Sequence, residues 1–171
     1  LRDELRDAAA ACDRVKHIIR DLKVFARNSE RDAAGPINVH HVLELSMRMA
    51  QNEIRHRARL LKSLDNVSAV HGNEARLGQV FLNLLVNAAQ AIEDGNADGN
   101  EIRVIARTGR EGHVEVEISD TGSGITAENL PHIFDPFYST KFAGSGLGLA
   151  SVVGVVRSHH GALCAASEVG K

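Results

Sequence analysis

Residues 73–92 read NEARLGQVFLNLLVNAAQAI, and this stretch decides how the rest of the chain is interpreted. Its apolar residues recur at helical spacing and form one stripe: Leu77, Val80, Phe81, Leu84, Leu85, Ala88 and Ile92. Asn73 is a suitable N-cap, and Glu74 lies in the first turn, where the helix dipole favours an acidic side chain. The pattern predicts an amphipathic helix that packs its stripe on a core.

The opposite face of this helix carries three carboxamide side chains. Asn83 and Asn87 are four residues apart and share a face, and Gln90 lies one step further along. Two neutral amide oxygens one turn apart suit a hard cation such as magnesium, provided that phosphates balance its charge. An ordinary exposed polar face is the alternative.

The sequence around this helix predicts further elements on both sides. Short strands are expected at 37–39 and 67–70, and a helix at 40–54. Alternation predicts strands at 60–64 and 114–118. Further strands are expected at 102–106, joined to 114–118 by a hairpin at 109–112, and at 162–166. A nearly apolar run predicts a buried helix at 147–158. Helices and mostly antiparallel strands in this order indicate an α+β fold, a two-layer α/β sandwich with the helices on one face.

A second motif, Asp120-Thr121-Gly122-Ser123-Gly124-Ile125, directly follows a predicted strand. A carboxylate at a strand end can accept a hydrogen bond from an exocyclic amine such as that of adenine. The glycines allow the backbone to approach a ring closely. A tight turn without a ligand would favour the same residue types.

A third motif, Gly144-Ser145-Gly146-Leu147-Gly148-Leu149, opens the helix predicted at 147–158. Glycines at a helix N-terminus expose backbone N–H groups, which attract anions such as phosphates. Lys141, just upstream, could add a positive charge. The spacing matches neither a Walker loop nor a Rossmann fingerprint, and a flexible loop is the alternative.

Together with Phe134-Asp135-Pro136-Phe137-Tyr138, these motifs resemble the N, G1, F and G2 boxes of sensor histidine kinases, in the same order and spacing. The resemblance covers roughly residues 14–171. It implies the Bergerat ATP-binding fold, shared with DNA gyrase, and a catalytic domain that transfers the γ-phosphate of ATP to a histidine in two-component signal transduction.

The resemblance also implies a role for individual residues, with ATP and Mg²⁺ as cofactors. Asp120 would bind the adenine amino group. The resemblance assigns the nucleotide to Asn83, Asn87, Gln90, Asp120, Gly122, Gly124, Ile125, Lys141, Gly144, Gly146, Leu147 and Gly148, and magnesium to Asn83 and Asn87. Phe134 and Phe137 would anchor a short ATP lid, residues 138–143, to the core.

Residues 1–30 show a heptad pattern. Its seam consists of Leu5, Ala8, Cys12, Val15, Ile19, Leu22 and Ala26. By resemblance this is the second helix of a dimerisation bundle, through which a homodimer would form. A helix that folds back on its own domain is the alternative. Residues 31–36 are then a linker, and 37–171 the catalytic domain.

The expected phosphate acceptor is missing, because no histidine of the chain stands in the family's acceptor motif; His17 is interpreted as a solvated helix residue. We therefore expect the chain to bind ATP without autophosphorylating in the usual way. A response-regulator receiver domain is the expected partner of the parent kinase.

Bulk composition excludes few functions. The net charge of −2 gives no reason to expect nucleic-acid binding. No run of about 18 apolar residues is present, which leaves membrane contact of a parent protein open. Cys12 and Cys164 form no metal or disulfide pattern, which suits a cytoplasmic, reducing compartment, and the paired histidines are a weak zinc signal.

Two other functions remain open. An ATPase of the same fold would, by resemblance, carry a glutamate general base where this chain has Asn83, and a carboxamide cannot take a proton. A non-catalytic module that dimerises and senses nucleotide would keep the motifs without the transfer reaction.

Overall fold

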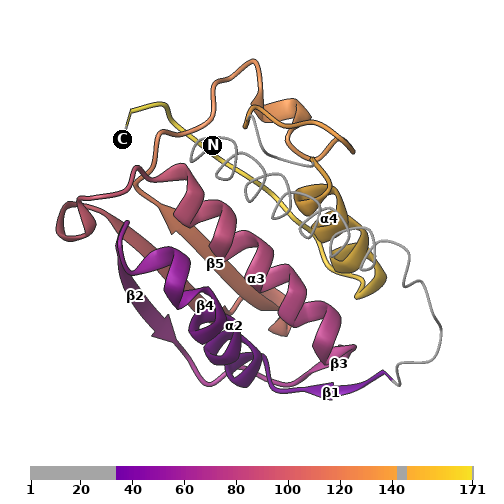
Figure 1. The fold of residues 1–171 in the computed structure, drawn as a ribbon. Helices are drawn as coiled ribbons and strands as arrows, with labels where there is room; N and C mark the ends of the chain where they lie inside the picture. Colours follow the sequence, from indigo (N-terminus) through magenta and orange to yellow (C-terminus); the bar gives the residue numbers. More distant parts are fainter. Residues whose placement is uncertain (1–33, 142–145, 171) are drawn as a thin grey trace, which may run out of the picture.

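The computed structural model describes residues 34–141 and 146–170, so the predicted helix at 1–30 lies outside the described residues. Helices α2 (Val39–Ile54), α3 (Glu74–Ala91) and α4 (Gly148–Ser158) form one layer, with α3 in the middle (Figure 1). The helix α3 packs against α2 on one side, α4 on the other, and the sheet beneath. The chain therefore forms the two-layer α+β sandwich that the sequence predicts.

The sheet that faces these helices has three strands in the order β2-β4-β5. They are β2 (Arg59–Leu64), β4 (Glu101–Thr108) and β5 (Val114–Asp120). The predicted hairpin is confirmed, because β4 and β5 pair antiparallel. By contrast β2 and β4 pair parallel, since α3 lies between them in the chain and acts as the crossover that parallel pairing needs.

A second, two-stranded sheet pairs β1 (Gly35–Ile37) with β3 (Val70–Gly72). The strand β1 thus begins within the segment predicted as a linker and ends before Val39, which starts α2. It places the described start of the chain beside the N-terminus of α3.

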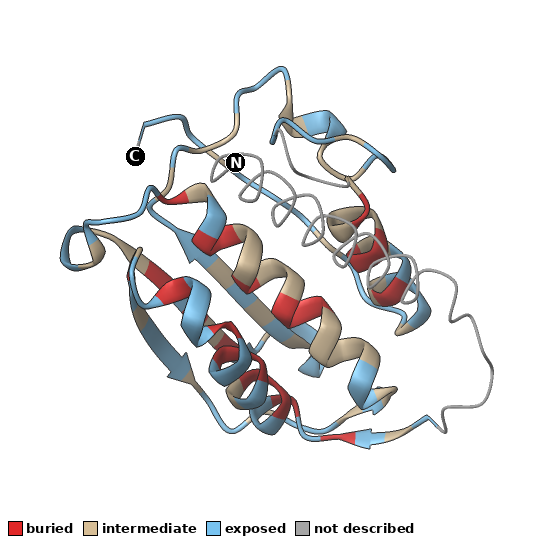
Figure 2. Cartoon of the chain, in the orientation of Figure 1, coloured by how far each residue is buried: buried red, intermediate tan, exposed pale blue. Residues whose placement is uncertain are grey.

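The core lies between the helices and the inner face of the sheet. Alternate residues of β4, Ile102, Val104 and Ala106, are fully buried, while the residues between them face outward. Figure 2 shows buried residues on the facing sides of α2 and α3. The stripe predicted for α3 supplies Val80, Leu85 and other members of this core.

The N-terminal end of α3 is held by specific contacts. Its N-cap is Asn73, as predicted, whose side chain accepts a hydrogen bond from Arg76 N at 2.9 Å. Asn73 N in turn donates to His159 Nε2 at 3.0 Å, and His159 Nδ1 contacts Val155 O at 2.8 Å. One imidazole therefore joins the start of α3 to the end of α4.

The predicted strand at 162–166 is wrong, because these residues belong to no strand in the structure. Three of the five are alanine, which is poor in strands and gives little side-chain burial in return for pairing. The segment is instead fixed further on, where Ser167 Oγ accepts from Ile125 N at 2.8 Å.

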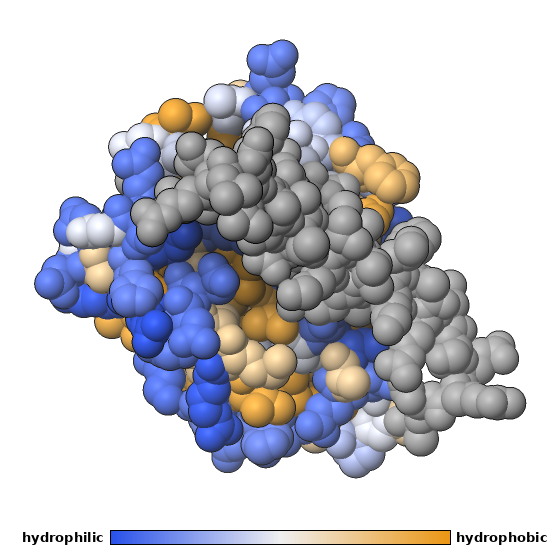
Figure 3. Space-filling view, in the orientation of Figure 1, coloured by the Kyte–Doolittle hydropathy of each residue, from blue (hydrophilic) through white to orange (hydrophobic). Residues whose placement is uncertain are grey.

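The helix at 147–158 is only partly buried: Ser151, Val152 and Val155 are covered, and Gly154 is exposed. Figure 3 shows apolar surface among hydrophilic surface on the helical side of the molecule. None of the helices in the described residues is long and apolar enough to cross a membrane.

Candidate functional site

The carboxamides of α3 lie next to the start of α4. Asn83 Nδ2 donates to Gly148 O at 3.5 Å, and Asn83 Oδ1 accepts from Gln79 Nε2 at 2.7 Å. Asn83 and Asn87 are both half-buried. The motif on α3 and the glycine motif before α4, 65 residues apart in the chain, are therefore brought together as the sequence predicts.

The N-terminus of α4 directs backbone N–H groups toward the site. Its N-cap is Leu147, and no side chain of the described residues caps this end. The first N–H groups of a helix have no intrahelical acceptor, and the dipole makes this end positive. These donors favour an anion.

The fold requires glycine at position 146 but not at position 148. Gly146 has φ +68°, and a Cβ there would lie 2.3 Å from the carbonyl carbon of Phe137. Its own carbonyl accepts from Phe137 N at 3.0 Å, which closes the base of the lid. A Cβ on Gly148 would meet no atom of the described structure within 4 Å, so the fold does not require glycine there.

Asp120 is the last residue of β5, and the glycine-rich turn begins directly after it. Gly122 N donates to Asp120 Oδ1 at 2.8 Å, which fixes one carboxylate oxygen. Ser123 N donates to Ala91 O at 2.9 Å, and a Cβ on Gly122 would lie 2.5 Å from that same oxygen. The turn therefore docks on the C-terminal end of α3, which requires glycine at position 122.

The second half of this turn is covered by the end of the chain. Gly124 has φ +71°, and a Cβ there would lie 2.2 Å from Glu168 O. Gly170 N donates to Ser123 O at 3.4 Å. Ile125, bonded to Ser167 as described above, is half-buried, so its side chain is partly accessible beside the turn.

Lys141, in the described part of the lid, reaches the Asp120 end of the site. Lys141 Nζ donates to Gln90 Oε1 at 3.1 Å. Partial burial lowers the pKa of the Lys141 ammonium, Asp120 opposes that shift, and Arg57 adds to it. The lysine predicted as a phosphate contact thus lies near Asp120 in this arrangement.

Phe137 does not pack on the core as predicted. It is 76% exposed, with φ +67°, because its N–H is bonded to Gly146 and the side chain turns outward. Phe134 is half-buried, which agrees with an anchoring role. Gly144 and the lid residues 142–143 lie outside the described residues.

These contacts place the two ends of the candidate site, the start of α4 and the Asp120 turn, at different points along α3. The α4 end touches α3 at Asn83, and the Asp120 turn touches it at Ala91, eight residues further on. At 1.5 Å rise per residue the two ends are about 12 Å apart along α3. A carboxylate at one end and a helix N-terminus at the other suit an elongated ligand with an amine and a phosphate chain.

The candidate metal ligands at this site are the neutral amides of Asn83 and Asn87. No group of three or more His, Cys, Asp or Glu side chains comes together in the described parts of the chain, which gives the zinc interpretation no support there. Asn83 Oδ1 is engaged by Gln79, so a cation at that oxygen would have to displace this hydrogen bond. The two amides fit a magnesium ion that arrives with phosphate oxygens, and not a free divalent site.

The family described as histidine kinase-, DNA gyrase B-, and HSP90-like ATPase matches residues 72–171, which contain α3, the Asp120 turn and α4. The chain belongs to this family. Among the members with a known role, the sensory histidine kinase/phosphatase NtrB of Rhizobium leguminosarum bv. phaseoli is 38% identical over 163 residues. That match covers 87% of this chain and 42% of NtrB, so the chain spans less than half of that relative's length.

Solved structures of family members have the same fold. The mycobacterial sensor histidine kinase MprB is 29% identical, with a TM-score of 0.68 over 76% of this chain and 83% of MprB. Full-length ShkA in complex with AMPPNP has a TM-score of 0.79 and covers 99% of this chain and 36% of ShkA. At 22% identity, ShkA supports the fold alone.

Some residues that build the site carry no motif signal of their own. Ser167 and Arg57, whose Nη1 donates to Ile92 O at 2.9 Å, come from distant segments. Thr121 lies inside the Asp120 motif, but only its partners in the structure give it a role. Such contacts depend on tertiary pairing and leave no periodic pattern in a single sequence.

Proposed function

We propose that this chain binds ATP with magnesium and is the catalytic domain of a sensor histidine kinase, which transfers the γ-phosphoryl group to a histidine supplied by another segment. The observation that carries the proposal is the placement of Asp120 and of the α4 N-terminus at two ends of one stretch of α3. Similarity to histidine kinases over most of the chain supports it.

At the adenine end, Asp120 is the specificity-determining group. Its Oδ1 is held by Gly122 N, which leaves Oδ2 as the acceptor for the exocyclic amine of adenine. Guanine carries a carbonyl oxygen at that position, which a carboxylate repels. The exposed position of Asp120 at a strand end lets a base reach it without rearranging the sheet.

At the phosphate end, the first N–H groups of α4 and the space that the described residues leave beside Gly148 would receive the polyphosphate. Asn83 and Asn87 would hold magnesium, which neutralises phosphate charge. Lys141 would reach the phosphates only if the lid moves, because its ammonium is bonded to Gln90 in this structure.

In the transfer step, the acceptor imidazole nitrogen forms a bond to the γ-phosphorus while the bond to the β–γ bridging oxygen breaks and ADP leaves. Positioning and charge stabilisation supply most of the catalysis in such reactions. Residues 79–91 of α3 contain no carboxylate that could activate water, so transfer to an imidazole, itself a nucleophile, is favoured over hydrolysis. A homodimer and a response-regulator receiver domain would be the partners of the complete kinase.

Calorimetric titration with ATP and with GTP, in the presence of magnesium, tests this proposal. We expect binding of ATP at one site, much weaker binding of GTP, and loss of ATP binding in Asp120→Asn. Arg103→Gln, a charge change on the outer face of β4, is the matched control and should bind ATP like the wild type. Equal affinity for the two nucleotides, or an unaffected Asp120→Asn variant, would overturn the proposal.

A further inference from the structure

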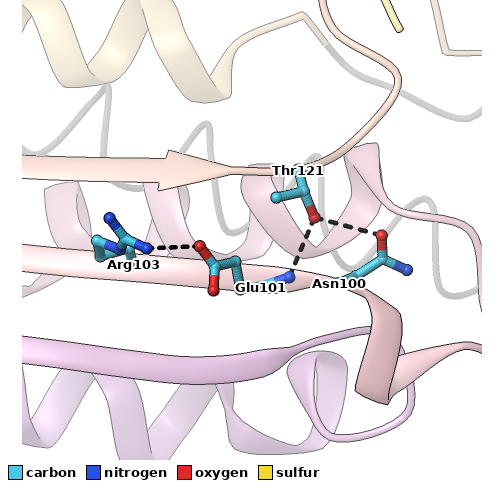
Figure 4. Close-up of polar contacts among 4 residues, drawn as sticks. All are labelled: Asn100, Glu101, Arg103 and Thr121. Carbon is cyan, nitrogen blue, oxygen red and sulfur yellow. Dashed lines mark hydrogen bonds and ion pairs between the residues drawn. The ribbon is translucent and has the colours of Figure 1, made fainter. Parts of the chain in front are cut away.

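The chain leaves the β-sheet immediately after Asp120, and a side chain controls where it leaves. Asp120 pairs with Ile102 across β4 and β5, so the next pair in register would be Glu101 with Thr121. Thr121 N donates to Glu101 O at 3.1 Å, as an antiparallel pair requires. The reciprocal bond is different: Glu101 N donates to Thr121 Oγ1 at 3.0 Å (Figure 4).

The hydroxyl of Thr121 therefore takes the place of its own main-chain carbonyl in the ladder. Since the carbonyl is released from pairing, the backbone can turn away at Gly122 without leaving Glu101 N unsatisfied. The strand pairing therefore extends to Thr121, and the turn begins at Thr121 as well. Asp120 is thus held between a paired position on one side and the docked turn on the other.

Asn100 fixes the rotation of this hydroxyl. Thr121 Oγ1 donates to Asn100 Oδ1 at 3.2 Å, which directs the hydroxyl proton away from Glu101 N and leaves a lone pair for it (Figure 4). Asn100 is held by two further hydrogen bonds. Its side-chain Nδ2 donates to Asn96 O at 2.9 Å, and its main-chain carbonyl oxygen accepts from Arg59 N at 2.9 Å. Contacts from the loop before β4 and from the edge strand β2 therefore hold Asn100, and Asn100 holds the hydroxyl of Thr121.

We propose that Thr121 and Asn100 are positioning residues for Asp120, and that they set how strictly the site selects adenine over other purines. Neither residue needs to touch the nucleotide. They fix the backbone on which the Asp120 carboxylate is mounted, so that its free oxygen points at the purine 6-position. This inference rests on the proposed nucleotide-binding function.

The test measures the affinities of ADP and IDP, with magnesium, for the wild type, for Asp120→Asn and for three further variants. IDP differs from ADP at the purine 6-position, where a carbonyl oxygen replaces the amine that Asp120 would accept from. Thr121→Val keeps the shape and removes the hydroxyl, and Thr121→Ser restores a hydroxyl. Thr108→Val is the matched control, because Thr108 is exposed at the other end of the same strand pair.

Thr121→Val should weaken ADP binding by about threefold to tenfold, the range that the loss of one hydrogen bond gives. IDP binding should change less, so the ratio of the two affinities falls. Thr121→Ser and Thr108→Val should keep the wild-type ratio. A lower stability alone cannot produce this result, because both nucleotides are measured on protein that is folded throughout.

An unchanged ratio in Thr121→Val, with ADP still bound and still lost in Asp120→Asn, overturns the positioning role while the proposed function stands. The same loss of selectivity in Thr108→Val also overturns it. Absence of ADP binding to the wild-type chain refutes the proposed function itself, and with it this inference.

Discussion

Gly148 and Gly154 both lie in α4, and replacing each with alanine separates the needs of the fold from those of the ligand. A Cβ at either position would meet no atom of the described structure within 4 Å, and neither has a positive φ. Alanine in a helix is favoured over glycine by about 0.5–1 kcal/mol, so both variants should be more stable without nucleotide. For a chain of this size the melting temperature should rise by about 1–4 °C.

The two variants should differ only when nucleotide is present. Gly148 is the first residue of α4, where the first N–H groups of the helix would face the proposed phosphates, whereas Gly154 is nearly two turns away. A methyl group at 148 blocks close approach of the phosphates. Loss of a charge-assisted hydrogen bond corresponds to about 10- to 100-fold weaker ATP binding, and Gly154→Ala should bind like the wild type.

Thermal unfolding followed by calorimetric titration with ATP and magnesium measures both effects on the same samples. The two effects of Gly148→Ala should have opposite signs: the protein becomes more stable and binds ATP less well. If Gly148→Ala lowers the melting temperature, glycine serves the fold after all. If it binds ATP as tightly as Gly154→Ala does, phosphates do not approach this helix end.

Three further predictions concern other parts of the molecule. Gly122→Ala should destabilise the fold by about 1–3 kcal/mol in urea unfolding, because the methyl group would collide with the last carbonyl of α3; unchanged stability would contradict the docking of the turn. His159→Ala should cost about 1–2 kcal/mol in the same assay by leaving the N-cap N–H of α3 without its acceptor, with ATP affinity unchanged; a variant as stable as the wild type would show that this bridge contributes nothing. A hydrogen bond from Lys62 lowers the pKa of Glu44 from 4.5, so this stabilisation is present above the unfolded-state pKa and is lost as pH falls through the folded-state value. Glu44→Gln should therefore reduce the loss of unfolding free energy at acid pH by less than about 1 kcal/mol, since solvent screens this ion pair. If the variant loses as much stability in acid as the wild type does, the assignment is refuted.

The features that sequence predicted well are local ones. The helix α3 follows from apolar spacing and from its cap Asn73, both of which are set by neighbours in the chain. The two strands of the hairpin follow from alternation, and the glycine motifs follow from backbone needs that Gly122 and Gly146 confirm. The family resemblance supplied the order of the motifs, and the structure brings Asn83 and Gly148 together.

The features that sequence missed are set by distant partners. Residues 162–166 form a short apolar run that can suit a strand, but they have no ladder partner in the structure. Phe137 was expected in the core because aromatic residues usually are, whereas its backbone bond to Gly146 turns the side chain outward. Thr121 needs the register of β4 and β5 before its role becomes visible.

The central claim is that a nucleotide lies along α3, with adenine at Asp120 and phosphates at the start of α4. An NMR titration of the backbone amides with adenosine and then with ATP and magnesium tests it most directly. We expect adenosine to shift the amides of residues 121–124 and to leave those of 148–150 unchanged, whereas ATP should shift both groups. Shifts of the α4 amides by adenosine, or no shift of them by ATP, would contradict this placement of the nucleotide.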